Sequence, residues 1–141
     1  MYIKKDYLCD DARLIREEVF IQEQGFHNEF DEIDDLATHI VFYEANLPIA
    51  TCRYYKGENS NEYIVGRIAI RKIYRGKHIG YVMMKVLEEC IFFEGGNLIT
   101  LSSQIQAQQF YEKNGYTAIG EPYLDEHCQH IHMEKSLKGV V

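Results

Sequence analysis

The chain has 141 residues, of which 46% are hydrophobic and 26% charged, a composition that suits a single globular domain over residues 1–141 and excludes a disordered or fibrous chain. It contains no apolar run of the roughly 20 residues that span a bilayer, and its N-terminus lacks the apolar stretch of a secretory signal, so we expect a cytoplasmic protein without a membrane partner. The net charge of −7 disfavours nucleic acid as a partner, because such binding depends on neutralising phosphates.

The charges are unevenly distributed along the chain. Between Gly66 and His78 there are five basic residues and no acid, whereas between Glu23 and Asp35 there are six acids and no lysine or arginine. The first segment suits an anionic ligand and the second a cationic one, although a solvated surface would explain either block alone. The four scattered cysteines form no CxxC pair, so we interpret them as reduced thiols.

The N-terminal third predicts a strand, a helix and a loop. We expect the strand over residues 2–7 and the helix from an N-cap at Asp10 or Asp11 to about Gln24, where Gly25 ends it. The acidic segment that follows predicts a loop with one helical turn.

The middle of the chain predicts three strands in an antiparallel meander. The first two cover residues 38–44 and 49–55, joined by a turn at 46–48, and a polar turn at 56–62 leads to the third, at 63–71. In this third strand alternation places four residues on one face and Arg67 and Arg71 on the other; the four are Ile64, Gly66, Ile68 and Ile70.

From Ile79 the apolar period changes to three and four residues, which predicts a helix with one buried face. The apolar positions are Ile79, Val82, Met83, Val86, Leu87, Cys90 and Ile91. Gly95 and Gly96 end this helix, and residues 98–101 predict a short strand.

The C-terminal part predicts one more helix and two strands. Ser103 with Gln106 fits a capping box that opens a helix over residues 104–114, which Gly115 ends. Strands begin near Tyr116 and cover residues 130–135. The order β-α-β-β-β-α-β-α-β-β indicates a mixed α/β (α+β) domain around one central sheet.

The segment Tyr74-Arg75-Gly76-Lys77-His78-Ile79-Gly80 lies between the third strand and the first apolar helix. A helix start offers unpaired N–H groups and a positive dipole end, which together bind phosphate. Gly76 and Gly80 let a ligand approach the backbone, while Arg75 and Lys77 add positive charge. The segment matches neither the Walker A pattern nor the dinucleotide-binding GxGxxG pattern. A tight strand-to-helix turn without a ligand is the alternative.

These residues resemble the R/Q-x-x-G-x-G/A acetyl-CoA motif of the GNAT N-acetyltransferases, with His78 where the family usually has its middle glycine. A second segment resembles the family's N-x-x-A-x-x-F-Y-E-K-x-G-F pattern: Gln104-x-x-Ala107-x-x-Phe110-Tyr111-Glu112-Lys113-Asn114-Gly115-Tyr116. Gln104 replaces asparagine there and keeps an amide. Further short matches resemble the small bacterial ElaA-like branch, among them Arg16, Glu23-Gln24, Asp34-Asp35, Thr38-His39, Tyr123-Leu124 and His130-Ile131-x-Met133.

The resemblance implies an N-acetyltransferase that uses acetyl-CoA as cosubstrate, without a metal, and moves the acetyl group to a primary amine by direct attack in a ternary complex. It also implies a set of cofactor contacts: the strand backbone at Ile68, Ala69 and Ile70, the loop residues Arg75, Gly76, Lys77, His78, Ile79 and Gly80, and Gln104, Phe110 and Tyr111. The resemblance is compatible with a homodimer.

For the chemistry, the resemblance places Tyr111 beside the cofactor sulfur as general acid, and a tyrosine with a pKa near 10 can donate a proton at neutral pH. Glu23 and His130 are candidates for the general base. His130 and His132 share one strand face, and histidine titrates in the required range. If the acidic segment borders the acceptor cleft, its carboxylates would attract a cationic amine.

Two other functions stay open at this point, a non-catalytic GNAT-like module that binds acyl-CoA as a sensor and a nucleotide-binding protein that uses the same loop. A metal site at His127, Cys128, His130 and His132 is the weaker interpretation, because no HExxH or CxxC framework accompanies it.

Overall fold

A computed structural model describes residues 1–138 of the chain. The chain divides into two compact units, of which the first comprises Met1–Tyr55 and Gly66–Lys85 and the second comprises Lys56–Val65 and Val86–Val141. Strand β4 (Glu62–Ile70) and helix α2 (Ile79–Phe93) contribute residues to both units.

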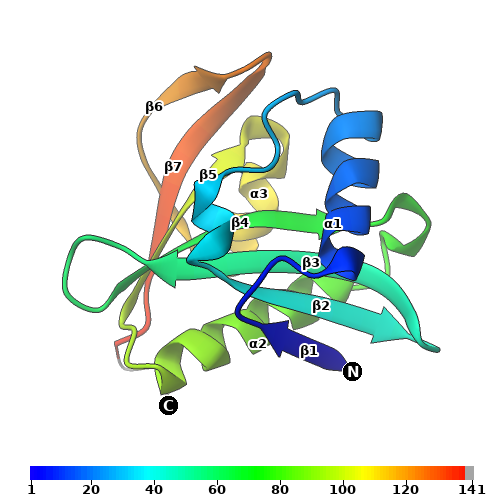
Figure 1. Ribbon diagram of the computed structural model, residues 1–141. Coiled ribbons are helices and arrows are strands. Elements are labelled where there is room, and N and C mark those ends of the chain that lie inside the picture. The colour runs from blue at the N-terminus through cyan, green and yellow to red at the C-terminus, as the bar shows by residue number, and fades with distance from the viewer. Residues whose placement is uncertain (139–141) are drawn as a thin grey trace. The chain divides into compact units, whose positions relative to one another are not determined.

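The first unit is built on three strands that lie side by side (Figure 1). Its elements are β1 (Tyr2–Lys5), α1 (Asp10–Arg16), the π-helix η1 (Glu17–Glu23), the 3-10 helix η2 (Glu32–Asp35), β2 (Thr38–Glu44), β3 (Leu47–Lys56) and the 3-10 helix η3 (Lys72–Tyr74). Strand β2 pairs antiparallel with both β1 and β3. The core of this unit includes Ala12 and Ile15 of α1 and Ile40 of β2, all fully buried.

The first helix has the expected end and a different beginning. Cys9 is its N-cap residue, and no side chain bonds to the first turn, so the prediction of an Asp10 or Asp11 cap is wrong. Asp11 instead accepts a hydrogen bond of 2.6 Å from the Tyr43 hydroxyl. At the other end the helix continues through η1, and Gly25 at φ +77° follows it as expected. The single turn predicted in the acidic segment is confirmed as η2.

The turn after β2 lies earlier than the sequence predicts. Ala45 and Asn46 both have positive φ, at +51° and +66°, as the two central residues of a tight hairpin of type I′ require. Leu47 and Pro48 therefore already belong to β3.

One residue of strand β4 departs from regular strand geometry. Arg67 has φ +52° within the strand, a conformation that is uncommon for residues other than glycine and interrupts the pleat. The buried β4 side chains are Tyr63, Val65 and Ala69, whereas the face predicted to carry the isoleucines is only half-buried. Buried and half-buried residues alternate along β4 except at Arg67, so the predicted two-sided strand holds apart from that position.

The second unit contains the other strands and the last helix. Its further elements are β5 (Leu98–Gln104), the 3-10 helix η4 (Ile105–Ala107), α3 (Gln108–Lys113), β6 (Thr117–Asp125) and β7 (Cys128–Ser136). The first part of β4 pairs in parallel with β5, β5 pairs antiparallel with β7, and β7 pairs antiparallel with β6. Figure 1 shows β6 and β7 as a long hairpin. Through the shared strand β4, the strand order is β1-β2-β3-β4-β5-β7-β6.

Several boundaries in this half differ from the predictions. The strand expected at 98–101 extends to Gln104, and a 3-10 turn precedes a helix of only six residues. The capping box is wrong, because the Ser103 hydroxyl donates to the Gln104 carbonyl instead. In α2 the buried positions differ from the predicted ones: Val82 is 54% exposed, while Met84 and Glu88 are buried. The predicted order of helices and strands is nevertheless confirmed throughout.

Candidate functional site

The loop between η3 and α2 has the geometry of an anion-binding turn. Gly76 and His78 both adopt left-handed backbone conformations, with φ +80° and +61°, and residues 75–78 are exposed. Nothing lies within 4 Å of where a Cβ on Gly76 would be, so its glycine is favoured by backbone conformation and not by crowding. Helix α2 follows directly with 15 residues, and its first N–H groups have no acceptor within the helix.

Arg75, at the start of this loop, is held by two partners. Its Nε donates to the carbonyl of Ile70 at 2.8 Å, and Nη1 and Nη2 donate to the two carboxylate oxygens of Glu23 at 2.6 and 2.8 Å. The hydrogen bond from Arg75 lowers the pKa of Glu23, and burial opposes this only in part. Glu23 is therefore an ion-pair partner with little basicity, which argues against the predicted role as general base.

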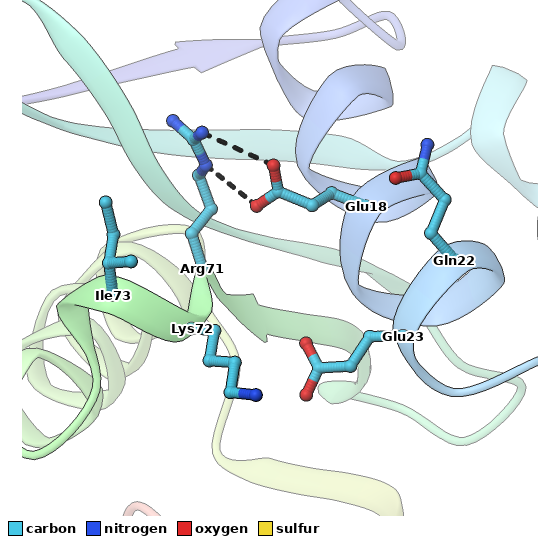
Figure 2. Close-up of a pocket in the computed structure, with 6 residues that line it drawn as sticks. All are labelled: Glu18, Gln22, Glu23, Arg71, Lys72 and Ile73. Carbon is cyan, nitrogen blue, oxygen red and sulfur yellow. Dashed lines mark hydrogen bonds and ion pairs between the residues drawn. The ribbon is translucent and has the colours of Figure 1, made fainter.

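A second ion pair of the same form lies next to the first. Arg71 donates through Nε and Nη2 to the carboxylate of Glu18 at 2.9 and 3.3 Å, and through Nη1 to the carbonyl of Pro48. This pair and Glu23 line a hollow of about 350 Å³, and Figure 2 shows the side chains that surround it. The lining residues are Glu18, Gln22, Glu23, Arg71, Lys72 and Ile73. The π-helix η1 is thus joined to the residues before the loop by two carboxylate–guanidinium pairs.

The acidic segment is largely neutralised by arginines in the first unit. Arg16 binds Glu29 and Asp34, each at 2.8 Å, and Arg53 binds Asp31 and Asp34, each at 2.7 Å. Arg67 of β4 completes the cluster with a contact of 3.0 Å between its Nε and Glu29 Oε2.

Three acids and three arginines therefore share one cluster of no net formal charge. The prediction that this segment attracts a cationic acceptor loses its basis at Glu29, Asp31 and Asp34, because their charges are already compensated. Of the six acids of this segment, Glu23, Glu32 and Asp35 are exposed, and Glu23 is paired with Arg75.

The pKa values in the cluster follow from burial and pairing. Burial raises the pKa of Asp34, but hydrogen bonds from Arg16 and Arg53 outweigh it and lower that pKa to about 2. The pKa of Asp31 is lowered in the same way, with burial outweighed by Arg53 and Arg67. Glu29 is the exception, since burial raises its pKa despite the neighbouring guanidinium groups.

Tyr111, the predicted general acid, lies in the second unit. Its side chain is buried on α3 and makes edge-to-face contacts with Phe110 and Tyr116, at 5.1 and 5.9 Å between ring centroids. The turn after this helix is anchored by Lys135, whose Nζ donates to Glu88 at 3.0 Å and to the carbonyl of Asn114 at 2.8 Å.

The same carboxylate also accepts a hydrogen bond from Tyr116. The Tyr116 hydroxyl donates to Glu88 Oε2 at 2.9 Å, so Glu88 joins α2, β7 and the residues after α3. Neither Glu88 nor Lys135 was identified from the sequence, because both lie outside the family-like motifs and a charged residue on a helix or strand normally predicts a solvated face.

Gln104 and His130 are brought together in the second unit. They are paired residues of β5 and β7. His130 is buried and its Nδ1 lies 3.0 Å from the carbonyl of Cys128, while its ring stacks on Tyr123. His132, expected to share its surroundings, is exposed instead.

Comparisons with known proteins agree with this fold and these motifs. The acetyltransferase (GNAT) domain family matches residues 9–137. The chain belongs to the GNAT acetyltransferase family.

Two bacterial proteins are similar to this GNAT protein over most of its length. It is 33% identical over 135 residues to the "Uncharacterized N-acetyltransferase YjcF" of Bacillus subtilis (strain 168), covering 94% of this chain and 95% of the relative. Protein ElaA of Escherichia coli (strain K12) is 27% identical over 124 residues, covering 84% and 81%. The ElaA crystal structure has a TM-score of 0.80 at 24% identity, covering 96% of this chain and 99% of ElaA.

A more distant solved structure shows the same fold. It is an aminoglycoside 6′-N-acetyltransferase complexed with coenzyme A, with a TM-score of 0.77 at 12% identity over 97% of each chain. The predicted family, its ElaA-like branch, the α+β fold and the assignment as a GNAT-type acyltransferase are confirmed.

Two further expectations concern metals and membranes. Among residues 1–138, no three histidine, cysteine, aspartate or glutamate side chains are grouped closely enough to hold a metal ion. Within the same residues, the helices are too short or too polar to cross a membrane.

Proposed function

We propose that this GNAT protein transfers the acetyl group of acetyl-CoA to a primary amine by direct attack in a ternary complex. The observation that carries the proposal is the exposed loop at residues 75–78, with two left-handed residues directly before a 15-residue helix. Such a loop presents backbone N–H groups to a phosphate, and the helix dipole favours the negative charge.

The residues present fit the pyrophosphate of coenzyme A. The backbone from Gly76 to Gly80 would supply the N–H groups, and Lys77, which is exposed, would add positive charge. Gly76 and His78 both have positive φ, and left-handed residues that alternate with right-handed ones can turn successive N–H groups of a short loop toward an anion.

The strand before the loop is the proposed contact for the pantetheine arm. Arg67, with φ +52°, turns the chain out of regular strand geometry just before Ile68, Ala69 and Ile70. Interrupted strands of this kind lack a regular ladder and often serve ligands, which supports backbone contacts from these three residues.

When bound, the cosubstrate supplies a thioester whose carbonyl carbon accepts the amine. The new C–N bond forms, the C–S bond breaks, and the departing thiolate needs a proton. We propose Tyr111 as its donor, since an ordinary tyrosine keeps its proton at neutral pH and can donate it as negative charge develops on the departing sulfur. Gln104 and Phe110 belong to the same proposed cofactor contacts.

His130 is the proposed general base. A carbonyl oxygen can only accept, so the Cys128 contact at 3.0 Å fixes the proton of the neutral ring on Nδ1 and leaves Nε2 as the acceptor nitrogen. An acceptor nitrogen on a buried ring can take the proton of the attacking ammonium. Glu23 is not proposed as base, because its ion pair with Arg75 lowers its pKa.

An acceptor screen with acetyl-CoA, monitored by release of free thiol, tests this function. We expect turnover with at least one primary amine, and about a 100-fold loss of kcat in Tyr111→Phe with the KM for acetyl-CoA within about threefold, as for removal of a general acid. Tyr63→Phe is a matched control, because it removes another buried hydroxyl in the same unit, one that donates to the carbonyl of Glu94. Coenzyme A binding without turnover on any amine would instead favour a sensor module.

A further inference from the structure

The guanidinium of Arg75 is already committed to protein acceptors. It uses Nε for the carbonyl of Ile70 at 2.8 Å and one N–H on each Nη for Glu23 at 2.6 and 2.8 Å. These are three of the five N–H donors of an arginine, and the fork-to-fork pairing fixes the plane of the group. The positive charge is therefore compensated before any ligand arrives.

The carboxylate that holds Arg75 comes from a firmly anchored element. Glu23 is the last residue of η1, in which Val19 and Phe20 are buried. Phe20 makes an edge-to-face contact with Phe26 at 6.4 Å just beyond the helix end. Because η1 is held in this way, Glu23 can fix the position of the loop rather than move with it.

The loop needs such a restraint. Its conformation depends on two residues with positive φ, Gly76 and His78, and a histidine there carries a conformational cost. Residues 75–78 are exposed, so little burial holds them in place. A loop that is ordered before binding loses less conformational entropy when the ligand binds.

We infer that Glu23 is a positioning residue that acts through Arg75 to preshape the loop, and that the phosphate is bound by the loop backbone and not by the Arg75 guanidinium. This inference rests on the proposed function and deepens it. It assigns Arg75 and Glu23 to one ion pair that holds the loop in place, which we call the clamp. Each of the two side chains binds the other, and neither binds the phosphate.

Removing the Glu23 carboxylate should change the affinity for coenzyme A in the direction opposite to the one that charge repulsion alone would give. Coenzyme A is a polyanion, so removing a nearby carboxylate should strengthen its binding if only charge mattered. Removing the Glu23 carboxylate should instead weaken binding, because the loop loses its preset conformation. Glu18→Gln is the matched control, since it removes the same charge and the same kind of ion pair from the same helix without touching the loop.

Titration calorimetry with coenzyme A on the full chain provides the test. We expect the Kd to rise about tenfold in Glu23→Gln, which corresponds to ~1.4 kcal/mol, while Glu18→Gln stays within twofold of the wild type. With acetyl-CoA and an accepted amine, Glu23→Gln should raise the KM for acetyl-CoA with kcat within twofold. Glu23→Asp, which keeps the charge on a shorter side chain, should lie between the wild type and Glu23→Gln.

The charge-swapped double variant Glu23→Arg/Arg75→Glu is decisive. If the pair is a clamp, the swap restores the Kd to within about threefold of the wild type; if Arg75 contacts the phosphate, glutamate at position 75 repels it and binding is lost. Tighter binding by Glu23→Gln, or failure of a folded swap variant to bind, would overturn the inference while the wild type still binds. A wild-type chain that does not bind coenzyme A would refute the proposed function itself.

Discussion

Replacing Asp34 with asparagine should lower the free energy of unfolding by about 3 kcal/mol at pH 7, since removing one carboxylate leaves the buried cluster with an excess positive charge. Asp34 binds the guanidinium groups of Arg16 and Arg53 at 2.8 and 2.7 Å, and all three side chains are at most 5% exposed. Asparagine preserves the shape of the side chain but leaves both arginines without this anionic partner.

The pKa of Asp34 gives an independent value for the contribution of this side chain to the free energy of unfolding. Lowering it from 3.8 to about 2 corresponds to about 2.5 kcal/mol of stability at neutral pH. Because the folded protein has the lower pKa, the unfolded chain binds the proton first and acid favours unfolding. The contribution is complete well above pH 3.8, is about half lost near pH 3 and disappears below about pH 2.

Urea unfolding of the wild type and Asp34→Asn between pH 7 and pH 3 measures both quantities. The difference in unfolding free energy between the two proteins should shrink by about half between neutral pH and pH 3. Asp35→Asn is the matched control, as its neighbouring carboxylate is exposed and should change stability by less than about 0.5 kcal/mol. A difference that is small at pH 7, or that does not change with pH, would refute the reasoning.

Two further substitutions test other parts of the structure. Gly76→Ala should cost about 1 kcal/mol in urea unfolding, because alanine at φ +80° is disfavoured even though the space is open; an unchanged midpoint would contradict the left-handed conformation. Lys135→Met should cost about 3 kcal/mol, as it removes the ammonium group that forms an ion pair with the buried carboxylate of Glu88, whereas Lys113→Met on the exposed side of α3 should have little effect in the same assay. Equal effects of the two lysine substitutions would count against the Glu88 network.

Local patterns in the sequence predicted the architecture well. The change of apolar period at Ile79 and the glycines at 25, 95 and 115, all with positive φ, identified where helices begin or end. These features depend on a few neighbouring residues, so they can be identified without tertiary structure. Details that depend on distant partners were predicted less well. Examples are the contact of Asp11 with Tyr43, the positive φ of Arg67 and the exposure of Val82.

In the candidate site too, local motifs were predicted well and contacts with distant residues were not. Motif spacing was sufficient to identify the loop from Arg75 to Gly80 and the segment around Tyr111. The pairing of Glu23 with Arg75, 52 residues apart, could not be seen in the sequence, and it argues against Glu23 as the base. In the same way, six acids in one segment suggested a cation-attracting surface, although three of them are compensated by Arg16, Arg53 and Arg67.

Thermal unfolding with and without coenzyme A species tests the central claim most directly, because a ligand that binds only the native state raises its stability. We expect acetyl-CoA and coenzyme A, each at about 100 times its Kd, to stabilise the protein by about 2.7 kcal/mol, and ATP at the same concentration to have little effect. Stabilisation by ATP alone would indicate a nucleotide-binding protein. No stabilisation by either coenzyme A species would contradict the proposal that the loop from Arg75 to Gly80 binds this cosubstrate.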